Sequence, residues 1–590
     1  MSQAKSRAAG RETQNQKPFT VHQSVLNNAR RLQGFPNHLS IHAGGIIISE
    51  EPIFYHTALQ MMPKGFPISH FDMHHGEDMG FHKFDVLSQR GLGHIKDAVE
   101  LVKMNQAKAV DIHDIPLIKR DGRVKAQLKS GHCIGCFYVE SPAMRGLLKK
   151  LRCEEYKHLV AASSVIRPGV AKSGMMKEYI RRFHQPNSFK YLHPVFEEHL
   201  GETFGVMVYQ EDVMKIVHHF AGLGLDESDV LRRLMSGKKK KGDRFEVLKK
   251  KYFDNCPQRG YPEAPSREVW RQVASFAGYS FCKAHSASFA VESFQSLYLK
   301  AYFPLEFMVA VINNFGGFYR TEYYFHEAKM AGARIHPPCV NHSVHLTAIR
   351  GSDIYTGFIH LSQLERTTSH KVVHQRAIGG PYRSLADFVS RVDVSSTQLD
   401  LLIRIGAFRF TGQSKCALMW EKNAVFNRKI PTGRSRGSGL LFADETEQFD
   451  LPTLEEGPFD QAFDEIELLG FPISCTPFDL LKKQTHPTDG VTAAQMPGHL
   501  GRMVTMVGYY VTRKDVRTVK RELMFFGTWL DRDGRFFDTV HFPNFIKSSP
   551  YRGKGIYRIE GRVVEEYGFP SLEVVKMERL PFRADERYGE

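Results

Sequence analysis

The 590-residue sequence has no long apolar run and few cysteines. No window holds about eighteen consecutive apolar residues, the length that a membrane-crossing helix needs. Residues 1–17 are polar with scattered basic side chains, and they lack the apolar stretch of a secretory signal. Eight irregularly spaced cysteines are too few for a disulfide framework in so long a chain. We therefore expect a soluble, cytoplasmic protein with no membrane partner.

Acidic residues are also in the minority. The chain has 80 lysines and arginines against 64 aspartates and glutamates, a formal net charge of +16. Such an excess suits a polyanionic partner, although it says little about fold. Hydrophobic residues make up 42% of the sequence, which favours a folded protein over a disordered one. The length is sufficient for several domains.

The densest basic stretch follows a predicted helix-rich segment. The segment that begins at residue 201 is predicted to form a short strand, which turns at residues 209–211 into an amphipathic helix with Val213, Ile216, Val217 and Phe220 on one face. A second helix is expected to stop at Gly237. Six of the ten residues from 232 to 241 are basic: Arg232, Arg233, Lys238, Lys239, Lys240 and Lys241. The helix dipole accounts for two or three of them. A phosphate-bearing partner is favoured for the rest, and a solvated basic face is the alternative.

These residues resemble the fingers of the bacterial replicative polymerases, the DNA polymerase III alpha subunit or C family. Residues 202–211 resemble the Tyr-Gln-Glu element of that family, and residues 231–235 with the lysines that follow resemble its Leu-Arg-Arg element. Residues 165–175 and 276–287 resemble two further family stretches. The resemblance extends, in the family's order, from about residue 20 to the end of the chain.

The resemblance implies a multidomain α+β fold. The expected parts are a disordered lead (1–20), the distal part of a polymerase-beta-like palm (21–110), large helical fingers (111–315), a helical clamp- and duplex-binding region (316–428), a linker and connector (429–500) and an OB-type β-barrel (501–580). Alternating apolar and polar runs between residues 503 and 575, with basic residues between them, independently suit a barrel that holds single-stranded nucleic acid. Residues 358–365 lack the glycines of the family's helix-hairpin-helix turn, so we expect a degenerate motif.

Two stretches near the start are predicted to be palm strands. The β-branched run from Gly44 to Ser49 is typical of a buried strand. On a strand through residues 82–86, Lys83 and Asp85 share one face, and we expect Phe84 and Val86 to face the core. An ordinary ion pair is one interpretation of Lys83 and Asp85. The resemblance instead implies that Asp85 is a catalytic, metal-binding carboxylate, that Lys83 contacts nucleotide phosphates, and that Mg²⁺ is the cofactor.

One carboxylate is too few for this chemistry. Two Mg²⁺ ions about 4 Å apart need several acidic ligands. The family takes the others from a Pro-Asp-x-Asp strand, and no such sequence occurs here. The phosphatase-like domain that opens family members and the palm's Gly-Ser phosphate loop are also missing. We therefore expect a truncated or split polymerase that needs two more palm carboxylates from elsewhere, either from a separate chain or from sequence upstream of a misplaced Met1. A noncatalytic DNA-binding or clamp-associated accessory protein is the alternative.

Three further residues are candidates for phosphate contact. Arg167 precedes Pro168-Gly169 at a predicted turn, where a structural ion pair is equally consistent with the sequence. Lys283 and His285 lie where a helix begins, and a helix start suits phosphate. A lone histidine is more often an ordinary core residue. The resemblance places both side chains next to the incoming nucleotide and the template.

Other motifs carry weaker predictions. Leu440, Leu441 and Phe442 follow a Gly- and Arg-containing linker and resemble the peptide that grips the sliding clamp, although an incidental apolar turn fits as well. The acidic and histidine residues between 72 and 82 lack the repeated spacing of a metal site. Cys133 and Cys136 form a lone C-x-x-C, and we expect small buried residues there.

The function implied is that of a DNA-directed DNA polymerase, which adds deoxynucleotides to a primer 3′ end during DNA replication. The partners implied are primer-template DNA, dNTPs, the sliding clamp and other replicase subunits. Lys238, Lys239, Lys240 and Lys241 are expected to contact DNA, and Arg232, Arg233, Lys83 and Lys283 to hold the triphosphate.

Overall fold

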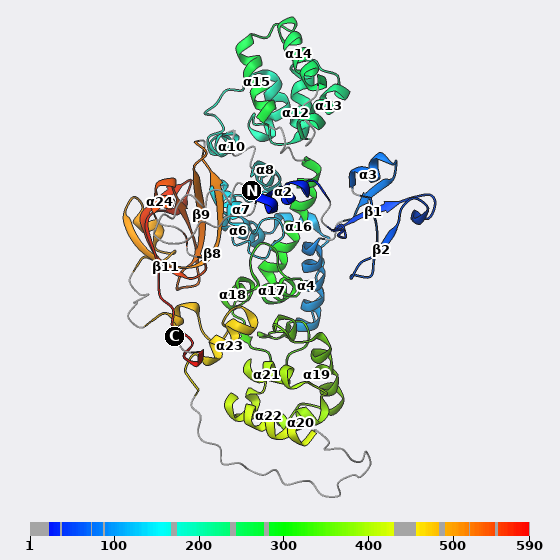
Figure 1. Cartoon of the computed structure of the whole chain (residues 1–590). Coiled ribbons are helices and arrows are strands. Elements are labelled where there is room, and N and C mark those ends of the chain that lie inside the picture. The colour runs from blue at the N-terminus through cyan, green and yellow to red at the C-terminus, as the bar shows by residue number, and fades with distance from the viewer. Residues whose placement is uncertain are drawn as a thin grey trace. The chain divides into compact units, whose positions relative to one another are not determined.

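The chain divides into two compact units in the computed structural model, Met1–Gln89 and Arg90–Glu590 (Figure 1). The structure describes residues 23–35, 38–71, 73–86, 89–166, 174–236, 243–275, 282–429, 456–482, 490–518, 520–548, 551 and 553–588. Among these residues, none of the helices combines the length and the apolar character needed to traverse a lipid bilayer.

The first unit is a set of short elements. They are α2 (Gln23–Arg31), β1 (Gly45–Ile48), β2 (Leu59–Met61), β3 (Pro67–Ser69), α3 (Met73–Asp78) and β4 (His82–Asp85), with a 3₁₀ turn at Ile53–Tyr55. Strands β1 and β4 pair antiparallel, with Ile46 opposite Phe84 and Ile47 opposite Lys83. Strands β2 and β3 form a second antiparallel pair. Both predicted palm strands are therefore confirmed as strands.

The predicted burial of these two strands is wrong. Ile46 and Ile48 of β1 are 52% and 55% exposed, and Phe84 and Val86 at β4 are 52% and 65% exposed. A strand face is buried only where another layer packs over it, and alternation along the sequence cannot show whether that layer exists. Within the described part of this unit, no large apolar side chain is in the buried core.

The second unit begins with a helical assembly. Its helices are α4 (Arg90–Gln106), α5 (Ile115–Arg120), α6 (Gly122–Ser130), α7 (Pro142–Leu151), α8 (Tyr156–Val165), α10 (Met175–His184), α11 (Pro194–Leu200), α12 (Gln210–His219), α13 (Leu225–Ser236), α14 (Asp243–Gln258), α15 (Glu263–Ser275), α16 (Lys283–Tyr302), α17 (Pro304–Asn313) and α18 (Thr321–Met330). Helix α16 contacts α4, α6, α8 and α17. Because it is surrounded, it buries Ala290, Phe294 and Leu297 completely.

A small sheet and a second group of helices follow. Strands β5 (Arg334–His336), β7 (Asp353–Tyr355) and β6 (Ala348–Arg350) form a three-stranded sheet in that order. Helices α19 (Arg366–Gly379), α20 (Leu385–Arg391), α21 (Ser396–Arg404), α22 (Lys415–Lys429) and α23 (Asp460–Leu469) come next. They share a hydrophobic cluster of their own, which includes Phe388, Leu402 and Phe408.

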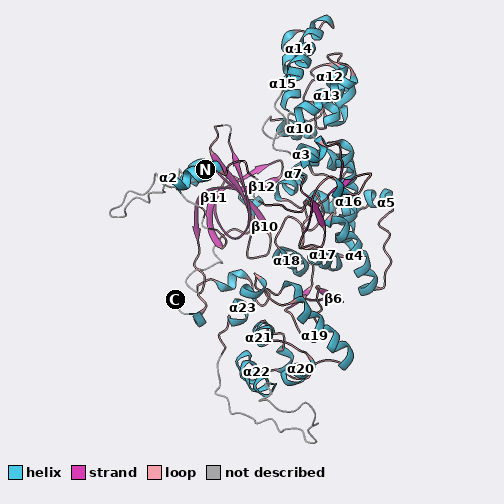
Figure 2. Cartoon of the chain, turned by 45° about the vertical axis from the view of Figure 1, so that its right-hand side comes forward, coloured by secondary structure: helices cyan, strands magenta, loops and turns pink. Residues whose placement is uncertain are grey.

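Five strands near the C-terminus close into a barrel, and Figure 2 shows them gathered as the main strand-rich part of the second unit. They are β8 (Met503–Arg517), β9 (Leu523–Leu530), β10 (Phe536–His541), β11 (Ile556–Glu566) and β12 (Phe569–Arg579), with α24 (Pro543–Ser548) between β10 and β11. The order around the barrel is β8-β9-β10-β12-β11, and only the β10–β12 pair is parallel. The strands expected from the alternating pattern are confirmed.

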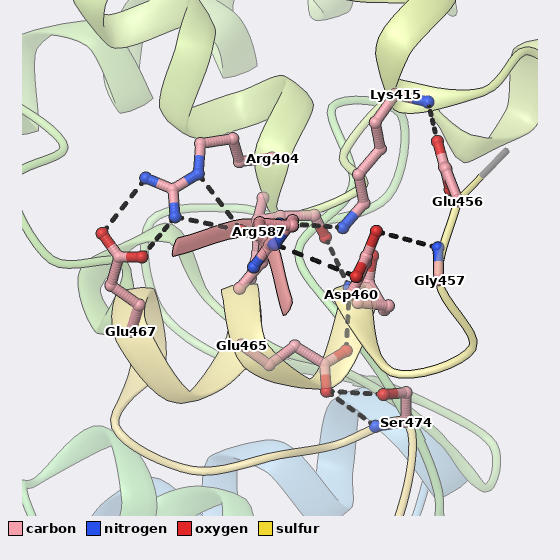
Figure 3. A network of polar contacts seen from close by, with 12 residues as sticks. Arg404, Lys415, Glu456, Gly457, Asp460, Glu465, Glu467, Ser474 and Arg587 are labelled. Carbon is pink, nitrogen blue, oxygen red and sulfur yellow. Dashed lines mark hydrogen bonds and ion pairs between the residues drawn. The ribbon is translucent and has the colours of Figure 1, made fainter. Parts of the chain in front are cut away.

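The chain end returns from the barrel to α23. Phe582 forms a bridge with Leu481, and Arg587 reaches Asp464 of α23. Asp464 is only 1% exposed and accepts from three cations: Arg404 at 3.0 Å, Lys415 at 2.7 Å and Arg587 at 3.1 Å. Figure 3 shows these cations converging above α23, with Glu467 holding the other side of Arg404. We call residues 580–588 the C-terminal strap.

Candidate nucleotide site

The segment before α12 has a shape that the sequence did not reveal. Residues 201–203 form a 3₁₀ turn, Phe204 has a φ of +55°, and Val206 to Tyr209 run buried without pairing to a strand. The strand predicted here is wrong, because these β-branched residues pack among helices and find no neighbouring strand in the described chain. Helix α12 is confirmed, with Val213, Ile216, Val217 and Phe220 all buried.

A buried carboxylate fixes the start of α12. Asp212 accepts hydrogen bonds from the backbone N–H groups of Val208 and Tyr209, each at 2.9 Å. Burial raises the pKa of Asp212 to about 6, although both hydrogen bonds oppose that shift. The turn that presents Gln210 and Glu211 is therefore held from within.

The two arginines on α13 share one carboxylate. Asp229 lies 2.8 Å from a guanidinium nitrogen of Arg232 and 2.8 Å from one of Arg233. Hydrogen bonding from Arg232 is the main reason why the pKa of Asp229 lies below its ordinary value. Arg232 also donates to Oε1 of Gln210 at 2.8 Å, so α13 is tied to the first residue of α12.

Lys283 is held at the start of α16 by two other carboxylates. Its backbone N–H donates to Glu211 at 3.1 and 3.2 Å, and its ammonium lies 2.6 Å from Glu202. The ammonium also lies 5.2 Å from the centre of the Tyr209 ring. Carboxylate oxygens thus occupy two positions, one at the N-terminus of α16 and one against the Lys283 ammonium. Phosphate oxygens would suit both positions equally well.

The structure brings Arg232 and Lys283 together around the start of α12. Arg232 bonds to Gln210, and Lys283 bonds to Glu211, the next residue. His285 is two residues further along α16, with its ring 3.9 Å from that of Phe289. We call the starts of α12 and α16 with the basic end of α13 the cationic socket.

The acidic partners in this socket were not predicted as site residues. Sequence reasoning selected cations and passed over Glu202, Glu211 and Asp229. For two of them the sequence held a signal in their position, since Glu211 lies at the predicted start of a helix and Asp229 lies about one helical turn before Arg232 and Arg233. A separation of 72 residues between Glu211 and Lys283 leaves no local pattern.

Lys83 and Asp85 lie side by side in the first unit, as predicted. The Lys83 ammonium is 2.9 Å from one Asp85 oxygen and 3.0 Å from the other. Hydrogen bonding from Lys83 holds the pKa of Asp85 below its ordinary value. A side chain at Gly45, opposite Asp85, would come within 2.9 Å of the Lys83 stem and 2.8 Å of His42. Glycine at this position therefore leaves room for the pair.

Several predicted residues lie outside the described ranges: Arg167, Lys238, Lys239, Lys240, Lys241, Leu440, Leu441 and Phe442. Lys83 and Asp85 belong to one unit and the cationic socket to the other. Joint action of Lys83 with Arg232 and Arg233 therefore stays a prediction.

The cysteine pair behaves as expected for core residues. Cys133 and Cys136 are completely buried, and burial raises the pKa of the Cys133 thiol to about 11. The described residues contain no group of three or more histidine, cysteine or acidic side chains arranged to hold a metal ion. Asp85 alone supplies one ligand group, which does not make a complete two-metal site.

Comparison with known protein families gives three matches along the chain. Residues 2–88 match the bacterial DNA polymerase III alpha NTPase domain, residues 91–260 its finger domain, and residues 332–418 a helix-hairpin-helix motif. The cationic socket lies largely within the finger match, and Asp85 lies within the first. A finger domain followed by a helix-hairpin-helix motif defines a polymerase-type, nucleic-acid-associated class of protein.

Curated relatives agree with these matches. The chain is 31% identical over 473 residues to the DNA polymerase III subunit alpha of Aquifex aeolicus, covering 79% of this chain and 39% of that protein. It is 29% identical over 550 residues to the subunit of the same name from Bacillus subtilis, covering 90% of this chain and 48% of that protein. The chain belongs to the bacterial DNA polymerase III alpha subunit family, and it spans less than half the length of these relatives.

Proposed function

We propose that this chain takes part in template-directed DNA synthesis, as a DNA-directed DNA polymerase that adds deoxynucleotides to a primer 3′ end in replication. The observation that carries the proposal is the cationic socket, where Arg232 and Lys283 meet at Gln210 and Glu211. An incoming triphosphate would take the places now held by the oxygens of Glu202, Glu211 and Asp229. Fixed cations and a helix start would then neutralise charge as it develops on the phosphates. Arg233, His285 and Arg167 are proposed as further contacts to the nucleotide.

Asp85 is proposed as the catalytic carboxylate of this chain, with Lys83 beside it to contact phosphate. Mg²⁺, when bound, would lower the charge on the attacking and leaving oxygens. Asp85 can supply one ligand group for the metal. The other ligands would come from outside the described residues, for example from a separate chain. The exposed apolar face of β1 and β4, with Ile46 and Phe84, is consistent with a segment packing there.

The nucleic acid and protein contacts are also proposals. Lys238 to Lys241 would contact DNA phosphates next to the socket. The barrel has the strand order of an OB-type Greek-key barrel, which suits a single strand of DNA. Leu440, Leu441 and Phe442 would bind a sliding clamp, and other replicase subunits would complete the assembly. The proposed parts remain a palm portion, fingers, a clamp- and duplex-binding region and this barrel.

A second candidate function has one observation in its favour. A noncatalytic DNA-binding or clamp-associated accessory protein would keep the fold and need no complete metal site. The described residues hold no three-ligand metal cluster, which this alternative accommodates directly.

Primer extension separates the two. We expect Asp85→Asn to abolish Mg²⁺-dependent extension, measured with the chain alone and after mixing with a polypeptide carrying a Pro-Asp-x-Asp palm segment. Affinity for primer-template DNA should change little, because Asp85 contacts metal rather than DNA. Asp393→Asn is the matched control, since that carboxylate pairs with Lys371 on another part of the chain. Equal loss of extension and DNA affinity in Asp85→Asn would contradict the assignment, and absence of extension in every mixture would favour the accessory protein.

A further inference from the structure

Three aromatic rings stack at one end of the small sheet. His336 ends β5 and Tyr355 ends β7, and the two residues are register partners. Their rings lie 4.8 Å apart and 17° from parallel. The exposed His342 ring lies 4.9 Å from that of Tyr355 and 21° from parallel. Arg350, which ends β6, places its guanidinium 5.6 Å from the Tyr355 ring.

Cations surround these rings in excess over carboxylates. Asp353 pairs with Arg334 at 2.6 Å and with His336 at 2.7 Å. Arg376 donates instead to carbonyl oxygens of residues 340 and 343, and Arg409 donates to those of residues 337, 338 and 406. Carbonyl groups satisfy these donors without removing their positive charge.

The effect of this charge is evident at His342. Burial of part of the ring lowers its pKa first, and Arg350, Arg409 and Arg376 lower it further. An exposed flat ring thus lies in a positive field. We call His336, His342, Arg350, Tyr355 and Arg409 the stacking face.

We propose that the stacking face binds single-stranded nucleic acid, with an unpaired base against the ring stack and the flanking phosphates against Arg350 and Arg409. Aromatic rings bind bases of any sequence through their π faces, and each stacked base contributes about 1–3 kcal/mol. Bases inside a duplex are already stacked on each other, so the face prefers a single strand. The site goes beyond the proposed polymerase function, and its residues are on different elements from those of the cationic socket.

The test uses the full-length chain and an oligothymidine of about 8 nucleotides, within the usual site size of such proteins, carrying one 2-aminopurine. Stacking quenches 2-aminopurine fluorescence, so the quench reports the ring contact directly. Binding is followed in parallel by anisotropy, with a duplex of the same length as the second arm.

We expect His342→Ala and Tyr355→Leu to remove most of the quench and to weaken single-strand binding by about 5-fold or more, given the usual energy of one stacked base. Arg350→Ala should lower the salt dependence by about one phosphate contact, near 0.7 in the logarithmic slope for a single strand. Lys371→Ala is the matched control, because that cation pairs with Asp393 in the same part of the chain. His342 is exposed, so its removal keeps the test independent of any folding defect in Tyr355→Leu.

Unchanged quench and affinity in His342→Ala and Arg350→Ala, with DNA still bound, would overturn the stacking face and leave the polymerase proposal standing. Equal effects on the duplex arm would also overturn it. Failure of the unmodified chain to bind either form of DNA would overturn the stacking face, and the polymerase proposal is then decided separately by primer extension in the mixtures described above.

Discussion

Glu292, the carboxylate of α16, lies in an environment that disfavours its charge. It is 7% exposed, and its Oε1 has no hydrogen-bond partner. That oxygen lies against Gly91 in the first turn of α4, so closely that a Cβ at residue 91 would come within 2.2 Å of it. Burial raises the pKa of Glu292 from 4.5 to about 7. Near neutral pH, the folded protein therefore holds a proton that the unfolded chain releases.

Glu292 makes stability depend on pH in a direction that can be worked out. Because the folded pKa is the higher one, this group costs nothing below about pH 4.5, and its cost grows as the pH rises to about 7. We expect Glu292→Gln to gain stability relative to the unmodified chain over that window, by about 1–3 kcal/mol at pH 8. Denaturant unfolding at several pH values measures the difference. A difference that stays flat between pH 4.5 and 8 would contradict this account.

Residue roles could be predicted from sequence where spacing decides them. Period-two alternation placed Lys83 beside Asp85, and helical spacing placed Val213, Ile216 and Val217 on one buried face. Ion pairs between elements that are far apart in the sequence could not be predicted. Lys283 meets Glu202 and Glu211, and Arg232 meets Gln210, only because α12, α13 and α16 converge. No local pattern encodes that convergence.

At the scale of elements, the C-terminal strap depends on one buried carboxylate. Asp464 of α23 is shared by Arg404, Lys415 and Arg587, which come from α21, α22 and the strap. Removing this shared buried acceptor takes the carboxylate from Lys415 and leaves Arg404 and Arg587 with their other partners, Glu467 and Asp585. The contact is therefore more important to the joining of these elements than any single exposed ion pair.

We expect Asp464→Ala to weaken the docking of the strap on α23 by about 3–5 kcal/mol, the usual cost of breaking a buried pair from one side. Hydrogen exchange in α23 and in residues 580–588 should increase accordingly. Glu560→Ala serves as the control, because its pair with Lys576 is on the surface and is worth about 1 kcal/mol or less. Unchanged protection of the strap in Asp464→Ala would show that its apolar contacts suffice.

Helices and strands could be predicted from the sequence where only one face of the element is buried. The prediction failed where the neighbouring elements determine the conformation or the burial of a segment. The five barrel strands follow from alternation, because each has an inner and an outer face. Residues 203–208 have the composition of a strand but lie among helices. The run from Gly44 to Ser49 did form a strand, β1, yet Ile46 and Ile48 are exposed. Whether another layer covers a strand depends on the rest of the unit and cannot be read from the strand's own sequence.

At the scale of the whole molecule, the two units differ in how they are stabilised. All the buried apolar side chains among the described residues belong to the second unit, from Ile95 onward. Its largest cluster joins the helical assembly to the barrel through Val511 and Leu530. The second unit therefore carries its own core, which includes part of the barrel.

We expect a chain beginning at Arg90 to keep the unfolding transition of the second unit, with a change of no more than about 0.5 kcal/mol, as for alterations that leave a core intact. Calorimetry on both forms measures this. A chain ending at Leu481 is the comparison, because it loses Val511 and Leu530 from the main cluster and should unfold at a lower temperature. Loss of the transition in the chain beginning at Arg90 would show that the second unit needs the first.

The parallel pairing of β10 with β12 has a consequence for synthesis on the ribosome. Strand β11 comes between them in sequence, so β10 has an open edge until residues 569–579 have emerged from the exit tunnel. Val511 of β8 and Leu530 of β9 emerge earlier, but the barrel that holds them against the helical assembly cannot close during that interval. Chaperone demand and cotranslational aggregation should therefore peak just before β12 appears, and a stop codon within β12 should leave the edge of β10 unpaired.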